Sequence, residues 1–423
     1  MSSAFLGGAR DRLLPVSIPF RFFVSAALFH LAAWGVLLLE ADQLGGFTGG
    51  PGPILAATHL ATLGVFAMTA IGASYQLLPV VTRRPLARDW PTRLSFWLLS
   101  PGICLLAWGM DRSSPGAMQT GAALVCSGLT VFAMLTADNL RRAGSVAVVA
   151  AHGWAALLAL VGLAVLGMLL VWDFQTGFLD DHAGLAAIHM VLASYGFMGL
   201  LVAGFSLVLV PMFALSRSLP QRPGWAQLVL AGVSLASFAC GRWTGNTAFN
   251  WLALLAGFGA AGTYLWLMRA AMARRMRKRL GLSFVLIRAS WGLLGISLIL
   301  GAALLADLPI PNAPALFGFL LLAGWLSTFL MGILQRIMPF LASMHASGKS
   351  GLPPPPSDLT PQTPLKIHAF CHFGALACCA AGIIMETTAL IRLGAVFGCV
   401  GALAFVGFAL IVLLRLRAFQ QGS

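Results

Sequence analysis

The chain has 423 residues, of which 59% are hydrophobic and only 9% are charged, and its formal net charge is +14. Soluble domains carry about 25% charged residues, so this composition excludes an ordinary soluble protein. The apolar runs reach the roughly 20 residues that a helix needs to cross a bilayer, and they are continuous rather than alternating, which favours helices over a barrel.

Twelve such runs predict twelve transmembrane helices. They cover residues 18–40, 54–79, 94–110, 116–138, 147–172, 185–213, 225–241, 247–270, 283–305, 313–341, 367–387 and 391–414. We therefore expect an all-α integral membrane protein that forms a single transmembrane domain over residues 1–423.

The positive charge is distributed unevenly between the two ends of these spans. All but three of the 26 Lys and Arg residues fall in or beside the termini and the loops after spans 2, 4, 6, 8 and 10; the exceptions are Arg112, Arg242 and Arg392. The positive-inside rule then predicts a multi-pass protein of a bacterial-type inner (plasma) membrane, with both termini in the cytoplasm. This placement indicates the lipid bilayer, and no nucleic acid, as the partner of the basic residues.

The first two spans carry the first candidate ligands. His30 lies in the middle of span 1, within AALFHLAAW, and His59 lies near the outer end of span 2. A histidine at such a depth is costly unless it faces the interior of the bundle. We interpret both as candidate cofactor-binding residues, and His59 also as a metal ligand; the alternative for each is a hydrogen-bonded core histidine.

A repeated pattern of two glycines and a proline begins in span 2. Gly64, Gly72 and Pro79 lie in HLATLGVFAMTAIGASYQLLP, and the same spacing recurs in segments 196–211 and 324–339, with successive copies 132 and 128 residues apart. Such periodicity predicts internal repeats, here three pseudo-symmetric four-helix units around a shared interior. They cover residues 13–143, 144–280 and 281–417. Close helix packing explains the glycines best.

The second repeat offers two more histidines. His182 follows Asp180 and Asp181 in an outer loop, and His189 lies on span 6 at the depth of His59 on span 2. Imidazole suits haem iron, copper and zinc, so we predict His182 and His189 as metal ligands together with His59.

The third repeat has no histidine at that depth. Phe317 and Phe319 occupy the place, while Arg288 and Arg336 lie near the cytoplasmic ends of spans 9 and 10. We predict that these arginines hold haem propionates or an anionic substrate; the alternative is that they extend toward the lipid headgroups.

Span 11 begins with His368 and His372, which are four residues apart and therefore on one helix face. The spacing suits a metal, but the position at the cytoplasmic end of the span favours a pair of interfacial histidines.

Several of these features together resemble subunit I of the haem-copper oxidase superfamily. They are the twelve spans, the cytoplasmic termini, the histidines near the outer starts of spans 2 and 6, and the H-x4-G pattern followed by a second glycine and a proline. The segment HLATLGVFAMTAIGASYQLLP looks most like the branch with the C-family oxidases and nitric oxide reductases, and PFRFF before span 1 resembles the NnrS proteins.

The resemblance implies haem b and copper as cofactors. It makes His59 an axial ligand of a low-spin haem and His189 the nearest match to a copper ligand, although His189 lies seven residues before its glycine and His59 five before its own. The family's His-x-His pair on span 10 and His-His pair on span 7 are absent. The resemblance therefore implies a haem- and/or copper-binding protein of respiratory or nitric oxide-related metabolism or electron transport, without a binuclear oxygen-reducing centre; whether it is an enzyme stays open.

Two other classes of function fit the same sequence. One is a cofactor-free membrane transporter, although the three repeats run in the same direction and transporter repeats are usually inverted. The other is a non-catalytic subunit or assembly factor of a respiratory complex, which would have a cytochrome or another subunit as partner.

Overall fold

The computed structural model describes residues 13–86, 88–143, 147–346 and 353–421, and all regular structure in these ranges is helical. Twelve helices are long and apolar enough to cross a membrane, as predicted. They are Ser17–Leu39, Pro53–Thr82, Trp90–Asp111, Pro115–Arg141, Ala147–Thr176, His182–Ala214, Gln221–Thr244, Thr247–Ala273, Leu282–Leu305, Ala313–His345, Gln362–Ile384 and Thr388–Gln421. Most extend a few residues beyond the predicted runs, because helix continues into the polar residues at the membrane surface.

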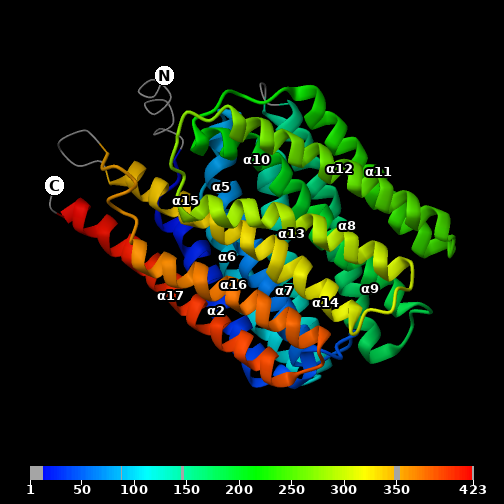
Figure 1. Ribbon diagram of the computed structural model, residues 1–423. Coiled ribbons are helices and arrows are strands. Elements are labelled where there is room, and N and C mark those ends of the chain that lie inside the picture. Colours follow the sequence, from blue (N-terminus) through cyan, green and yellow to red (C-terminus); the bar gives the residue numbers. More distant parts are fainter. Residues whose placement is uncertain (1–12, 87, 144–146, 347–352, 422–423) are drawn as a thin grey trace.

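The helices are labelled in chain order, and three spans are divided by a π-helical segment (Figure 1). The undivided spans are α2 (Ser17–Leu39), α6 (Trp90–Asp111), α7 (Pro115–Arg141), α8 (Ala147–Thr176), α11 (Gln221–Thr244), α12 (Thr247–Ala273), α13 (Leu282–Leu305), α16 (Gln362–Ile384) and α17 (Thr388–Gln421), with the short α3 (Ala41–Leu44) after α2. The divided spans are α4 (Pro53–His59), η1 (Leu60–Ala67) and α5 (Met68–Thr82); α9 (His182–Val191), η2 (Leu192–Met198) and α10 (Gly199–Ala214); and α14 (Ala313–Phe319), η3 (Leu320–Ser327) and α15 (Thr328–His345).

The order of helix contacts is the same in each group of four spans. The first span packs on the second, the third pairs with the fourth, and the fourth packs on the first span of the next group. The last of these contacts, α17 against α2, closes the helices into a ring. The division into three sequence repeats stays a prediction, and residues 144–146 at the start of the second lie outside the described ranges.

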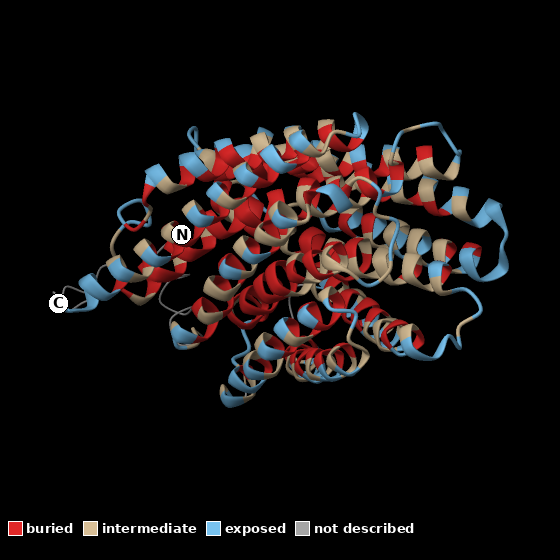
Figure 2. Cartoon of the chain, turned by 90° about the horizontal axis from the view of Figure 1, so that it is seen from below, coloured by how far each residue is buried: buried red, intermediate tan, exposed pale blue. Residues whose placement is uncertain are grey.

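The three divided spans form the inside of this ring. In their most apolar stretches 67–78% of the residues are buried, against 22–50% in the other nine spans. The segments η1, η2 and η3 also contact one another pairwise. Figure 2 shows the resulting pattern, with buried residues inside and exposed residues on the outer helices. The exposed residues include large apolar side chains such as Leu158 and Trp97, as a lipid-facing surface requires.

Five of the six glycines in the repeated Gly, Gly, Pro pattern are positions of close helix packing, as predicted; the exception is Gly324, where a Cβ atom would meet its nearest neighbours at 3.5 Å. A Cβ atom at Gly64 would lie 2.5 Å from Cγ of Phe29 on α2, and one at Gly204 would lie 2.7 Å from Cβ of His152 on α8. At Gly332 it would meet the backbone oxygen of Ser283 on α13 at 2.8 Å. Each inner span thus uses a glycine to approach the first span of its own group.

The three prolines of the repeated pattern lie inside their helices, and the span predicted over residues 54–79 continues to Thr82. Pro79 lies inside α5, which ends one turn later, where Arg83 adopts a left-handed backbone with φ of 57°. Pro211 precedes a similar end at Leu215, with φ of 53°. A proline removes one backbone hydrogen bond and disturbs the preceding turn, but the residues after it keep their N–H groups, so a helix can continue beyond it.

Both ends of the described chain meet at one end of the bundle (Figure 1). His345, the last residue of α15, bonds through Nε2 to the backbone oxygen of Leu14 at 2.9 Å, and Gln420 of α17 donates to the backbone oxygen of His345 at 3.3 Å. The two ends therefore lie on the same side, as an even number of spans requires; that this side is cytoplasmic stays a prediction.

Candidate functional site

A cavity of about 1030 Å³ occupies the interior of the ring. Its lining is mostly aliphatic and aromatic, and it comes from all three inner spans and from outer helices that include α7, α8, α11, α12 and α13. Cavities of about 300–1,000 Å³ hold small molecules and cofactors in proteins, so this one lies at the upper end of that range. Four of the predicted ligands line it: His30, His59, His182 and His189.

His59 and His189 lie close together, and both line this cavity. Their ring centres are 6.5 Å apart and their ring planes differ by 25°. His59 is the last residue of α4, one residue before η1, whereas His189 lies in α9, three residues before η2. His59 lies five residues before its glycine and His189 lies seven before its own, yet this difference does not prevent the two imidazoles from lying close together.

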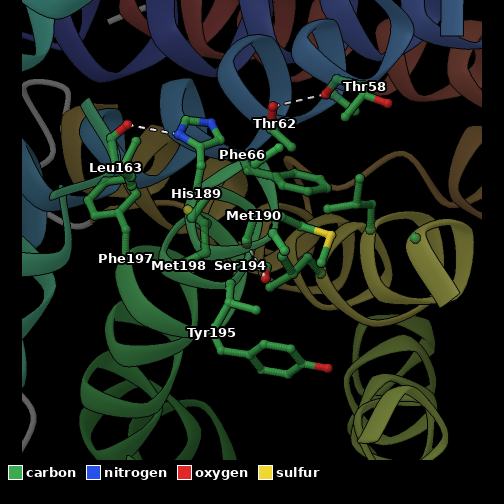
Figure 3. Close-up of a pocket in the computed structure, with 18 of the residues that line it drawn as sticks. Thr58, Thr62, Phe66, Leu163, His189, Met190, Ser194, Tyr195, Phe197 and Met198 are labelled. Atoms are coloured by element: carbon green, nitrogen blue, oxygen red, sulfur yellow. Dashed lines mark hydrogen bonds between the residues drawn. The ribbon is translucent and has the colours of Figure 1, made fainter. Parts of the chain in front are cut away.

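The backbone fixes the tautomer of both rings. Nδ1 of His59 lies 3.0 Å from the backbone oxygen of Leu55. Nδ1 of His189 lies 2.8 Å from the backbone oxygen of Leu163, and Figure 3 shows this second contact. A carbonyl can only accept, so each Nδ1 carries the proton and each Nε2 keeps its lone pair. No hydrogen bond involves either Nε2 within the described ranges, and metal-binding histidines typically show this arrangement.

A glycine on α8 makes room for the His189 ring. A Cβ atom at Gly167 would lie 3.1 Å from Cε1 and 3.6 Å from Nδ1 of His189. Gly167 also lines the cavity. The ring is thus held between its bond to Leu163 and the bare backbone of the same helix.

The separation of this pair fits one metal atom between two imidazoles. Metal–nitrogen bonds are about 2.0–2.1 Å long, which puts two imidazoles on opposite sides of one metal roughly 6 Å apart between ring centres. Neutral imidazole nitrogens are suitable donors for haem iron and copper. The donor set of His59 and His189 therefore fits the cofactors that the sequence predicts.

His182 is held by a carboxylate at the outer end of the cavity. Its Nδ1 lies 2.6 Å from Oδ2 of Asp173, whose other oxygen accepts from the backbone N–H of Leu179 at 2.7 Å. Its ring centre is 4.7 Å from that of Phe174. Because the carboxylate accepts the N–H of Nδ1, Nε2 of the neutral ring keeps its lone pair, so His182 can still bind a metal.

His30 belongs to a different group of histidines from His59. Its ring centre lies 6.3 Å from that of His368, which in turn lies 5.5 Å from that of His372. We expected His368 and His372 at the membrane interface, but this was wrong: they are 0% and 2% exposed. Span 11 buries this face because α16 packs against α17, and α17 packs against α2, which carries His30.

The two predicted arginines do not reach the cavity. Arg336 donates from Nε to Oγ of Ser283 at 2.7 Å, and its guanidinium lies 5.8 Å from the ring centre of Phe284. Arg288 is exposed on α13. Their role in binding a cofactor stays a prediction.

Other polar residues of the cavity were not predicted from the sequence. Arg242 of α11 lines it near His182 and lies 3.6 Å from a carboxylate oxygen of Asp181. Arg242 was one of the three exceptions to the charge asymmetry, which was a signal that could have found it. Tyr195 and Trp325 also line the cavity, with ring centres 5.2 Å apart, but aromatic residues in apolar helices carry no such signal.

Comparison with solved structures identifies the fold. The chain is similar to a haem-copper terminal oxidase dimer solved by cryo-EM, with a TM-score of 0.65 and 14% sequence identity over 96% of this chain and 84% of that chain. No protein-family model matches the chain, and a search of curated proteins finds no match. The protein therefore has the fold of the haem-copper terminal oxidases, as the resemblance in its sequence predicts.

Proposed function

We propose that this protein is a haem-binding membrane protein that keeps the haem-copper oxidase fold, with His59 and His189 as the ligands of the haem iron. The observation that carries the proposal is the close pair of imidazoles, 6.5 Å apart in one cavity, each with Nδ1 bonded to a backbone carbonyl. Such a pair would hold an iron atom from two inner helices at once.

The other residues of the cavity support a haem. Its apolar lining suits a porphyrin, and Arg242 at the outer end would bind the carboxylates of haem propionates. Gly167 and the carbonyl groups of Leu55 and Leu163 hold the imidazoles in orientation before the cofactor binds.

Two axial histidines favour electron transfer over oxygen reduction. When bound, the haem supplies one-electron chemistry. If His59 and His189 both bound the iron, they would leave it no free protein-side position for oxygen. The third inner span has phenylalanines at the equivalent positions: Phe319 precedes η3 as His59 precedes η1, and Phe317 precedes η3 by three residues as His189 precedes η2. The absence of histidine from these two positions supports the prediction of a protein without a binuclear oxygen-reducing centre.

We place this function in respiratory or nitric oxide-related metabolism of a bacterial-type inner membrane. A cytochrome or another subunit of a respiratory complex is the partner that such a haem would need as electron donor or acceptor. Co-purification of a cytochrome with the tagged full-length protein would support the partner.

The absorption spectrum of the purified full-length protein tests the proposal. We expect a Soret band and about one haem per chain when the cells are supplied with haem precursor. The variants His59→Ala and His189→Ala should lose most of the band, whereas His345→Gln, which replaces a histidine outside the cavity, should keep it. A wild-type protein without a Soret band would contradict the proposal.

A cofactor-free transporter is the second candidate, and the volume of the cavity favours it. A cavity of about 1030 Å³ inside a ring of helices has room for a solute as well as for a cofactor. A colourless protein that takes up solute in proteoliposomes would establish this alternative.

A further inference from the structure

A second group of histidines lies outside the pair of the proposed haem site. We call it the His30 cluster: His30 of α2 with His368 and His372 of α16. The three side chains are 5%, 0% and 2% exposed. Their ring centres follow one another at 6.3 Å and 5.5 Å, so three imidazoles lie together in the apolar interior of a membrane protein.

Two of the three histidines of this cluster lack hydrogen-bond partners among the described residues. Both ring nitrogens of His368 are buried without a hydrogen bond, and no hydrogen bond involves the His30 ring within the described ranges. His152 shows how a structural histidine of this protein is satisfied: its Nδ1 bonds to the backbone oxygen of Val148 at 2.8 Å and its Nε2 to the side-chain amide of Gln227 at 2.6 Å. Buried nitrogens without partners are rare in folded proteins, and a bound ion or water is a usual explanation for them.

The third histidine has a hydrogen-bonded ring nitrogen. Nε2 of His372 lies 2.7 Å from Oγ1 of Thr328, and that hydroxyl donates its own proton to the backbone oxygen of Ala323 at 3.3 Å. When the hydroxyl donates to Ala323, Nε2 donates its N–H to Thr328, and the lone pair is then on Nδ1. A hydroxyl that orients a histidine in this way is typical of the surroundings of a metal ligand.

We propose that the His30 cluster binds one Cu(I) ion through its three imidazoles. Imidazole is a good ligand for copper and zinc, and the charge of the site decides between them. Within the described ranges the one histidine–carboxylate pair is His182 with Asp173, so no such pair supplies negative charge to the His30 cluster. Burying an ion in an apolar medium costs free energy that rises with the square of its charge, so three neutral ligands favour a monovalent ion over Zn²⁺.

Binding requires the rings to move closer together. As the side chains stand, no three ligating groups of the described residues surround one point. Three imidazoles on one metal have ring centres roughly 5 Å apart, given metal–nitrogen bonds of about 2.0 Å. The pairs at 5.5 Å and 6.3 Å therefore need to close by an ångström or so. His30 also lines the large cavity, which gives an ion a route to the cluster.

A titration of the purified full-length protein with Cu(I), against a chromogenic Cu(I) chelator under reducing conditions, tests this proposal. We expect the wild type to hold one equivalent of Cu(I), and His368→Leu and His372→Leu to bind it at least about 100-fold more weakly. Thr328→Val, which removes the orienting hydroxyl, should weaken binding roughly 10–100-fold. His345→Gln should bind as the wild type does.

The stability of the metal-free variants separates ligation from folding. Leucine at 368 replaces two unpartnered nitrogens with an apolar side chain, so metal-free His368→Leu should melt at or above the temperature of the metal-free wild type. The proposal is independent of the haem: the Soret band of His368→Leu should be unchanged. Wild-type protein that binds no Cu(I), binding that survives His368→Leu, or binding that is lost in His59→Ala instead would each overturn it.

Discussion

His59 and His189 come from helices more than a hundred residues apart in the chain, yet their ring centres lie 6.5 Å apart. Each ring donates its Nδ1–H to a backbone carbonyl. The carbonyl of Leu55 is one turn before His59 on the same helix, whereas that of Leu163 belongs to α8. Both imidazoles are thus oriented by backbone that the fold holds rigidly, which is how proteins prepare a ligand for a metal.

The space beside His189 should be necessary for this orientation. Gly167→Val would place a branched side chain where even a Cβ atom lies 3.1 Å from the His189 ring. We expect a roughly 10–100-fold loss of haem affinity, of the size seen when groups that orient a ligand are altered. Haem titration of the cofactor-depleted protein measures it.

A glycine in an open position provides the control for Gly167. Gly232 of α11 has nothing within 4 Å of its Cβ position. Gly232→Val should leave haem affinity unchanged. Equal haem affinity in Gly167→Val and the wild type would show that the His189 ring does not need this space.

The contact between α2 and the first inner span should depend on Gly64. A methyl group there would overlap the root of the Phe29 side chain, 2.5–2.6 Å from its Cγ and Cβ atoms, so Gly64→Ala should destabilise the protein by about 1–3 kcal/mol. Unfolding in a denaturing detergent gives the difference in free energy. Gly318→Ala, at an open position of α14, should not destabilise, and Phe29→Ala should relieve part of the loss in the double variant.

His152 should behave as a structural residue and not as a ligand. It is 1% exposed, and its bond to Gln227 joins α8 to α11. Gln227→Leu leaves a buried ring nitrogen unpaired and should cost about 1–3 kcal/mol of unfolding free energy. The absorption spectrum of the haem-loaded variant should match the wild type; a shifted Soret band would mean that His152 acts on the cofactor.

The outer loop after α8 should be held by Asp173. Its carboxylate accepts from the Leu179 amide and from His182, so Asp173→Asn removes the charge that both bonds use. Hydrogen exchange followed by mass spectrometry should show faster exchange at residues 177–182. The neighbouring exposed Asp180 offers a matched control, because Asp180→Asn should leave exchange in this loop at the wild-type rate.

Much of the fold is predictable from the sequence because apolar length and charge placement determine membrane spans directly. All twelve spans and the packing role of Gly64 and Gly204 follow from such patterns. The π-helical segments do not, because an extra residue in a helical turn leaves no mark in a stretch such as LATLGVFA, which reads as ordinary apolar helix.

The candidate site is predictable only in part. Equal depth on equivalent spans predicted that His59 and His189 belong together. The convergence of His30 with His368 depends instead on closure of the ring through α17, a contact between the two ends of the chain that no local pattern encodes. The position of His372 near the start of its span led to the wrong prediction that it lies at the membrane interface. A helix that begins at the surface can still bury one face completely, as α16 does at His372.

The spin state of the iron in the oxidised, haem-loaded protein tests the central claim most directly. Electron paramagnetic resonance and near-infrared magnetic circular dichroism should show low-spin haem with two imidazole ligands in the wild type, and loss of that signature in both His59→Ala and His189→Ala. High-spin iron in the wild type, or a bis-imidazole signature that persists in either variant, would contradict the assignment of this pair as the haem ligands.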